Sequence, residues 1–385
     1  MFGKMMNNYY YGKSGKGDFR KEDLPTTRKE LFRQTLRTRF ASLIRLNLLY
    51  AIIWLPAMIV IYLCFNQIYT LTNNMNLYSV SYNEYLEFAQ KNEIEAITSS
   101  EYAEKKEQVA LATRDYDLYI QVKPNENIEQ FNTRTANTQG YSDWIKSIIL
   151  QYLIYLIPCI AITGPFTAGL SYVTRNWARD EHAFIWNDYK DAIKSNWKIP
   201  LVISIITSII PLIVFEGWNF YGELASGNVI MTIPQVLIPV LGAFWSISVT
   251  YMYPMTVTYD LKLRDVLLNG IKFGEFRLPF SVAIRLLHCV PVIIFFIAQL
   301  LFGLDMMLAL LLLGAYYILI GFSLSRFITA SYTNAVFDRF MNSRIEGAKV
   351  NQGLQSADDY DDDEEDPGDS DFTVNNNEEP ATGKE

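Results

Sequence analysis

Residues 163–198 read TGPFTAGLSYVTRNWARDEHAFIWNDYKDAIKSNWK, and this stretch decides the fold. It begins inside an apolar run and ends in a segment that mixes charged and aromatic side chains. Such a stretch is typical of a chain that passes from lipid to the membrane boundary, where basic and aromatic side chains collect. Apolar blocks lie on both sides of it. The sequence therefore predicts an integral membrane protein with several spans.

Half of the 385 residues are apolar, and these residues are clumped. A hydrocarbon core about 30 Å thick needs about 20 apolar residues in a helix, because backbone groups at that depth must pair internally. Six blocks meet or approach this length, and we expect spans at 46–70, 148–172, 199–217, 229–253, 281–303 and 306–327. The predicted fold class is all-α: a polytopic membrane protein of about six transmembrane helices.

The N-terminal arm, residues 1–45, carries eleven Lys and Arg against four acidic residues. Basic residues next to a span stay in the cytoplasm, so we expect the N-terminus inside the cell. An even number of spans brings the C-terminus to the same side, and basic residues follow the second, fourth and sixth blocks. The expected localisation is the plasma membrane, and the first expected partner is the lipid bilayer.

Three further parts surround or form the membrane core. Residues 71–146 are predicted to be an extracytoplasmic insertion, residues 147–353 the rest of the core, and residues 354–385 an acidic cytoplasmic tail. Thirteen acids and one lysine in 355–385 predict disorder, because such a segment buries too little apolar surface to fold. The insertion is either a small helical cap over the spans or a recognition domain for an extracellular ligand or partner.

Within the insertion, Ser81 and Glu84 are spaced as a capping box, which predicts a short helix after them. We expect a second helix over 100–113 and a short strand over 115–122. The insertion is therefore predicted to be mainly helical.

Amphipathic helices are expected at the cytoplasmic surface near 176–198 and 259–273. In the first, an apolar face is predicted to contain Ala178, His182, Ile185, Trp186, Tyr189, Ile193 and Trp197. We expect the rings of Trp186, Tyr189 and Trp197 to be buried at headgroup level or against the spans. The pair Gly164-Pro165 should break or bend the helix before it.

Residues 164–198 resemble the signature of the YesL family, bacterial membrane proteins of undetermined biochemical role. LNLLY at 46–50 and YMYPMTVTYDLKLRDVLLNGIKFG at 251–274 are similar to two further stretches of that family. The insertion and the acidic tail depart from the family pattern. The resemblance implies an association with carbohydrate uptake or sensing systems of Gram-positive bacteria. It marks a candidate functional motif at Gly164, Pro165, Arg175, Asn176, Arg179, Glu181, Asp188, Lys194 and Asn196.

Cysteine and histidine usage speaks against a metal or cofactor site. All three cysteines, at 64, 159 and 289, lie in apolar blocks, and no CxxC pair occurs. His182 and His288 are far apart and belong to no metal-binding pattern, and no nucleotide-binding or acyl-transfer motif is present. We therefore expect no catalytic residues, no metal, no cofactor and no nucleic-acid partner.

Arg285 and His288 stand three residues apart within the fifth predicted span. Ionisable groups inside a span are costly, so they often line a polar pathway or a proton-linked site. The alternative is an arginine that snorkels to the interface beside a histidine whose hydrogen bonds are satisfied. The sequence leaves both interpretations open.

The expected function is that of a non-enzymatic accessory or regulatory component of solute uptake or sensing, which docks on a membrane transporter or sensor. The alternative is a small-solute permease, since prolines interrupt several spans, although no inverted repeat is visible. An intramembrane enzyme is a third and weaker alternative, because the sequence contains no catalytic cluster.

Overall fold

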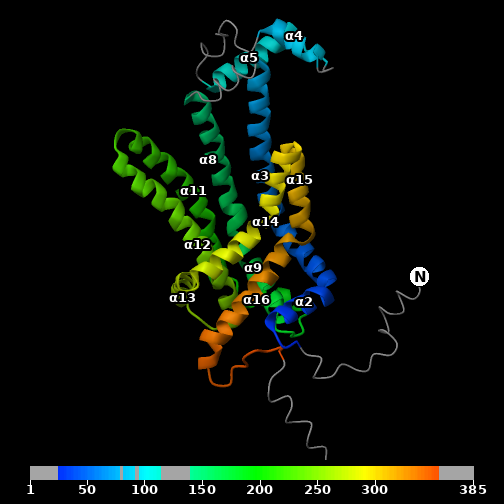
Figure 1. Cartoon of the computed structure of the whole chain (residues 1–385), viewed down its shortest axis with the longest axis vertical. Helices are drawn as coiled ribbons and strands as arrows, with labels where there is room; N and C mark the ends of the chain where they lie inside the picture. The colour runs from blue at the N-terminus through cyan, green and yellow to red at the C-terminus, as the bar shows by residue number, and fades with distance from the viewer. Residues whose placement is uncertain (1–24, 79–80, 92–94, 114–138, 355–385) are drawn as a thin grey trace, which may run out of the picture.

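The computed structural model describes residues 25–78, 81–91, 95–113 and 139–354. Every regular element that these residues form is a helix, which confirms the all-α prediction (Figure 1). Six helices are long and apolar enough to cross a membrane: Phe40–Thr70, Ser142–Ala161, Lys198–Gly227, Val229–Thr258, Leu278–Phe302 and Met306–Arg344. The expected strand at 115–122, the N-terminal part of the basic arm and the acidic tail lie outside the described residues.

The long helix α3 (Phe40–Tyr78) joins the two ends of the molecule (Figure 1). At 1.5 Å per residue its 39 residues extend about 58 Å, so one end projects beyond a hydrocarbon core of about 30 Å. That end carries α4 (Tyr82–Lys91) and α5 (Ser99–Thr113), and we call it the distal end. The opposite end is the basal end, where four helices gather: α2 (Arg28–Thr38), α9 (Thr163–Trp177), α13 (Leu263–Phe276) and α16 (Phe322–Phe340).

The insertion begins as predicted. The Glu84 carboxylate accepts from the Ser81 N–H at 2.9 Å, and the Ser81 hydroxyl oxygen accepts from the Glu84 N–H at 3.4 Å, which confirms the capping box. Tyr82, Tyr85 and Tyr102 pack their rings together, with centroids 4.9 to 5.9 Å apart. This aromatic contact joins α4 to α5.

The helix break at Gly164-Pro165 is confirmed, and it divides the second predicted span. Helix α8 (Gln139–Ala161) ends there, and α9 (Thr163–Trp177) begins. Pro165 has no N–H to donate to the Ala161 carbonyl, and the Ser204 hydroxyl of the neighbouring helix donates to that carbonyl instead, at 2.5 Å. The predicted end of this span at residue 172 was therefore wrong, since residues 163–172 belong to a separate buried helix.

The predicted continuous helix over 176–198 was also wrong. Helix α9 stops at Trp177, and α10 (Asn187–Ser195) starts after a non-helical connection. Asp180 takes a left-handed conformation with φ of 58° in this connection. The Asn176 carbonyl accepts from the N–H groups of both Arg179 and Glu181, which fixes the turn. Periodicity alone does not reveal this stop, because residues on both sides suit a helix.

The remaining helices complete the bundle, and the last of them, from Met306 onward, form one continuous span (Figure 1). They are α11 (Lys198–Gly227), the short turn η2 (Val229–Met231), α12 (Thr232–Thr258), α13 (Leu263–Phe276), α14 (Leu278–Phe302), α15 (Met306–Tyr316), the π-helical turn η3 (Tyr317–Gly321), α16 (Phe322–Phe340) and the short turn η4 (Asn342–Arg344). Several boundaries differ from prediction. Helix α3 starts before residue 46 and continues past residue 70 into the expected insertion, and α11 continues through most of the expected loop at 218–228. Helix α13 replaces the expected helix at 259–273, and the last span continues well past residue 327.

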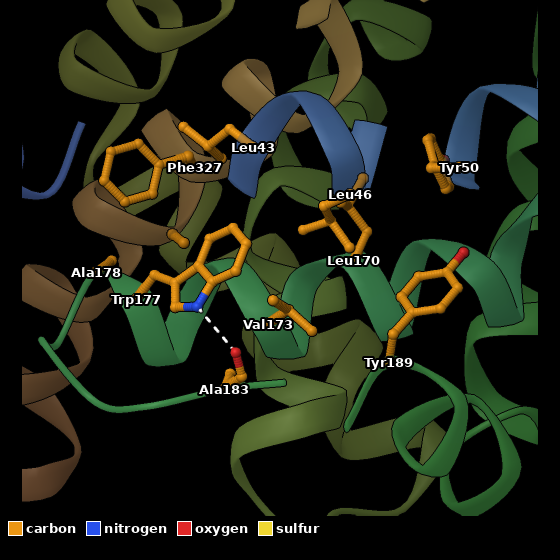
Figure 2. Packing of buried hydrophobic residues seen from close by; sticks show 11 residues of the cluster. Leu43, Leu46, Tyr50, Leu170, Val173, Trp177, Ala178, Ala183, Tyr189 and Phe327 are labelled. Atoms are coloured by element: carbon orange, nitrogen blue, oxygen red, sulfur yellow. Dashed lines mark hydrogen bonds between the residues drawn. The ribbon is translucent and has the colours of Figure 1, made fainter. Parts of the chain in front are cut away.

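The core lies at the basal end, around α9. Leu170, Val173 and Trp177 of α9 pack against Leu43, Leu46 and Tyr50 of α3, with Phe327 of α16 and Tyr189 of α10 beside them (Figure 2). Most of α9 is buried on all sides. A helix with a charged end is thus enclosed by protein instead of by lipid.

Candidate functional site

Gly164 is the first motif residue, and it sets the contact between α9 and α11. A Cβ at Gly164 would overlap the Pro200 carbonyl and the Ser204 hydroxyl. Only a residue without a side chain allows this approach, as at other close helix crossings in membranes. Together with Pro165, which starts α9, this residue has a structural role.

Four motif residues gather at the C-terminal end of α9. The Arg175 guanidinium donates to the Asn176 side-chain oxygen at 3.1 Å, and Arg179 pairs with Glu181 at 3.2 Å. Burial, and next the like charge of Arg179, lowers the pKa of Arg175 from its usual value. The backbone carbonyl of Arg175 accepts from Asn334 of α16 at 3.3 Å. The cluster fastens α9 to the last helix.

A second cluster of polar side chains, around Asp338, connects residues near both ends of the described chain. Asp338 is buried, and its carboxylate pairs with Arg28 and accepts from the Asn351 N–H at 3.1 Å. Asn342 donates to Asp338 and accepts from the Tyr259 hydroxyl at 2.7 Å. Burial raises the pKa of Tyr259 to about 12, so its hydroxyl stays protonated and able to donate. We interpret these contacts as a latch that joins α2 to the end of the bundle.

The other three motif residues lie apart from this cluster. Asp188 accepts from the Phe184 N–H at 2.7 Å and so orders the start of α10. Lys194 is exposed, and Asn196 lines a surface cavity of about 500 Å³ between residues 195–200 and 256–261. The nine motif residues therefore do not form one site. Most of them build the basal core.

The two intramembrane polar residues do converge with other groups. Arg285 of α14 and Arg326 of α16 both line a cavity of about 430 Å³ and an adjoining cavity of about 200 Å³. Trp54 of α3 lines both cavities as well, and His288 lines the smaller one. The larger cavity also has walls from α8, α9, α11 and α12, so all six spans meet there.

Both arginines point toward α12. The Arg285 side chain donates to the Ser246 backbone carbonyl, and the Arg326 guanidinium lies 5.0 Å from the centre of the Tyr253 ring. The Arg285 Nε is buried and has no hydrogen-bond partner. An arginine that snorkels places its head in water, so this geometry favours the interpretation of Arg285 as part of a polar lining.

His288 behaves differently from its neighbour. Its Nε2 lies 3.0 Å from the Ser325 carbonyl and 3.4 Å from the Thr329 hydroxyl. The Thr329 hydroxyl itself donates to the Ser325 carbonyl at 2.9 Å. These contacts match the interpretation of a histidine with satisfied hydrogen bonds. Both residues of the pair predicted from the sequence thus line the smaller cavity, but only the histidine has its hydrogen bonds satisfied there.

Charge is unbalanced at the two cavities. Within the described ranges, Arg285 and Arg326 form no ion pair, and no Asp or Glu lines either cavity. The Trp54 Nε1 and the Thr250 hydroxyl, both on the cavity walls, are buried without a hydrogen-bond partner. The residues that line the cavities therefore carry hydrogen-bond donors without acceptors and positive charge without a counter-charge.

Sequence reasoning missed Arg326, Trp54 and Thr250 as site residues. Arg326 was interpreted only as a marker of the cytoplasmic end of the last span, since that span was expected to stop at residue 327. Helix α16 in fact continues to Phe340, so Arg326 lies well inside the helix. An arginine within the uncharged stretch GFSLSRFITA, residues 321–330, was the signal that could have identified it.

No group of three or more His, Cys, Asp or Glu residues that could hold a metal ion occurs among the described residues. A family described as a protein of unknown function, DUF624, matches residues 144–218. This range covers most of α8, all of α9 and α10, and more than half of α11. No protein with a curated description and no solved structure matches the chain.

Proposed function

We propose that this chain is a non-enzymatic membrane protein that binds a small polar solute between its spans and acts as an accessory or regulatory component of solute uptake or sensing. We further propose that it belongs to the YesL family, which carries the DUF624 domain. Its partner in this role is a membrane transporter or sensor.

The cavity of about 430 Å³ is the observation that carries the proposal. Its volume lies in the range of about 300–1,000 Å³ typical of small-molecule sites. Residues that line it on α11 run from Ser204 to Val214, which is about 9 to 24 Å along the helix from Lys198. A solute bound at this depth contacts every span, so its presence can change how the spans pack and what they present to a partner.

The resemblance of three stretches to the YesL family supports the family assignment. Leu46, Asn47 and Tyr50, from LNLLY, are buried against α9 and α16, and Tyr251 to Thr256 are buried in α12. The three stretches therefore meet in the basal half. Basic residues in α2 and α13 support a cytoplasmic basal end in the plasma membrane.

A permease is the second candidate, and one observation favours it. The last span contains the π-helical turn η3, and the second span is broken before Gly164. Both irregularities adjoin the cavities, since Tyr317 lines the smaller cavity and Thr163 the larger. Broken helices next to a central site are a feature that transporters use.

Two measurements on the same purified protein separate these functions. An accessory component should co-purify in mild detergent with a transporter or sensor in fixed proportion, and should not move solute by itself in liposomes. A permease should give solute flux in liposomes without any partner. If the protein recovers no partner and gives no solute flux, both proposals are rejected.

A further inference from the structure

We propose that the cavity shared by Arg285 and Arg326 is an anion-binding site, and that the solute carries a phosphate or carboxylate group. This inference rests on the proposed function and adds the chemical class of the ligand. Arg285 and Arg326 would hold the anionic group, and Trp54 and Thr250 would donate further hydrogen bonds to it.

The first argument is the missing counter-charge. Moving a charged group from water into an apolar interior is costly unless a partner of opposite charge pairs with it. Here the two guanidinium groups line the same cavities and interact as like charges, and neither forms an ion pair with a described residue. An anion between them would offset both burial and mutual repulsion.

The second argument is the set of donors without acceptors. Buried polar atoms are nearly always hydrogen-bonded, so each exception needs an explanation. Three such atoms belong to residues that line the smaller cavity: the Trp54 Nε1, the Thr250 hydroxyl and the Arg285 Nε. Two of these three atoms can only donate, as can both guanidinium groups. A ligand rich in acceptor oxygens satisfies them, and phosphate and carboxylate are such ligands.

The third argument concerns the rest of the solute. The larger cavity has apolar walls from Ile210, Pro211 and Val214 on α11 and from Trp245 on α12. Hydroxyl groups of Thr163, Thr167 and Thr207 lie on the same walls. This mixture suits a compact solute with hydroxyl groups and a ring or chain, attached to the anionic group. A sugar phosphate has this chemistry.

Thermal unfolding of the full chain in mild detergent tests the proposal, with inorganic phosphate, glucose 6-phosphate and neutral glucose as probes at constant ionic strength. Near saturation, either phosphate should raise the apparent Tm by about 2–4 °C, and glucose should not. In the double variant Arg285→Gln with Arg326→Gln the shift should vanish. Without phosphate, the double variant should melt at the wild-type temperature or above it, because two unpaired buried charges are gone.

Arg277→Gln is the matched control. Arg277 directly precedes α14, lies 4.3 Å from the Phe280 ring centre and lines neither cavity. This variant should keep the full response. Should the double variant not fold, the single changes Arg285→Lys and Arg326→Lys keep the charge and remove the planar fork, so the apparent Kd for phosphate should rise about tenfold.

The phosphate could also come from a lipid headgroup, so the same variants are compared in nanodiscs of phosphatidylcholine with and without phosphatidylglycerol. Phosphatidylglycerol could stabilise the wild type but not the double variant, while soluble phosphate has no effect. That result would uphold the anion site and identify a lipid headgroup as the source of the phosphate. No response to any anion, or an equal response in the double variant, would overturn the proposal. A response to glucose alone that the double variant loses would reject the anion and leave the proposed solute function intact.

Discussion

The two halves of α12 have different surroundings. Ten consecutive residues of its basal half, 247–256, are buried on every side. In its distal half, the side chains of Ile233, Val236, Leu237, Val240 and Leu241 are half exposed or more. The same helix therefore has a protein environment at one end and a lipid-facing surface at the other.

This difference shows where the fold is specified. Lipid is as apolar as leucine, so apolar side chains alone give spans little reason to associate, and close packing and hydrogen bonds must do so. The buried polar residues that can form such hydrogen bonds concentrate in the basal half, on α9, on the basal part of α12 and on α16. The cavity with Arg285 and Arg326 lies where the packed half begins to open. The following predictions test the contrast between the halves.

The largest effect is expected at Trp177. Its indole is 1% exposed in the basal core and donates to the Ala183 carbonyl at 3.4 Å (Figure 2). Trp177→Ala should cost about 3–5 kcal/mol of stability, because it leaves a large cavity. Trp218→Ala, at a ring 47% exposed in the distal half, should cost far less. Thermal unfolding in detergent measures both, and equal losses would refute the contrast.

Asn47 should give the next largest effect. Its amide donates to the Tyr317 and Ile318 carbonyls at 2.8 and 2.6 Å and accepts from the Ser323 N–H at 2.8 Å. These bonds satisfy the backbone of the π-helical turn, so Asn47→Ala should cost on the order of 3 kcal/mol. Gln235→Ala is the distal control, since its one hydrogen bond, to Trp218, is 3.4 Å long. A loss at Asn47 no larger than at Gln235 would mean that the turn does not depend on this side chain.

A smaller loss is expected when Gly164 becomes alanine. The added methyl group would push α11 away from α9 at Pro200, and overpacking of this kind typically costs about 1–3 kcal/mol. Nothing lies within 4 Å of a Cβ built at Gly227, so Gly227→Ala in the distal half should be neutral or slightly stabilising. Unfolding temperatures of the two variants decide the matter. An unchanged temperature for Gly164→Ala would show that the contact is not tight.

The smallest effect is expected from Trp186→Ala combined with Trp197→Ala. The sequence predicted both rings to be buried at headgroup level or against the spans; they are 59% and 46% exposed on the protein surface, so they do not pack against the spans. In detergent the double variant should lose less than about 1 kcal/mol. Thermal unfolding measures the loss of stability, and the loss in the Trp177→Ala variant, measured in parallel, serves as the reference. A loss as large as that of Trp177→Ala would mean that these rings pack against something at the basal surface.

Much of the fold could be predicted because length and apolarity determine a span. The break at Gly164-Pro165 was predictable too, since proline removes a hydrogen bond whatever surrounds it. The stop after Trp177 was not, because it depends on the bond from Trp177 to Ala183 and on the left-handed Asp180, neither of which helical periodicity reveals. Local periodicity favoured one helix there, and packing produced two.

For the site, Arg285 was predictable as a costly residue within a span. Its relation to Arg326 was not, because the two arginines stand 41 positions apart in the sequence and belong to two successive spans. Trp54 and Thr250 carry no signal of their own, since aromatic and hydroxyl residues are common in spans. Only the packing of α3, α12, α14 and α16 shows that these four side chains line one pair of cavities.

A spin-label scan along α12 in liposomes tests the central claim most directly. Single labels at successive positions from 232 to 256, with Cys64, Cys159 and Cys289 replaced by alanine, report contact with oxygen dissolved in the lipid. We predict high oxygen contact with a helical period over the distal half, and uniformly low contact over 247–256. The same periodic contact along the whole helix would contradict a packed basal half, and with it the place of the arginine cavity at its edge.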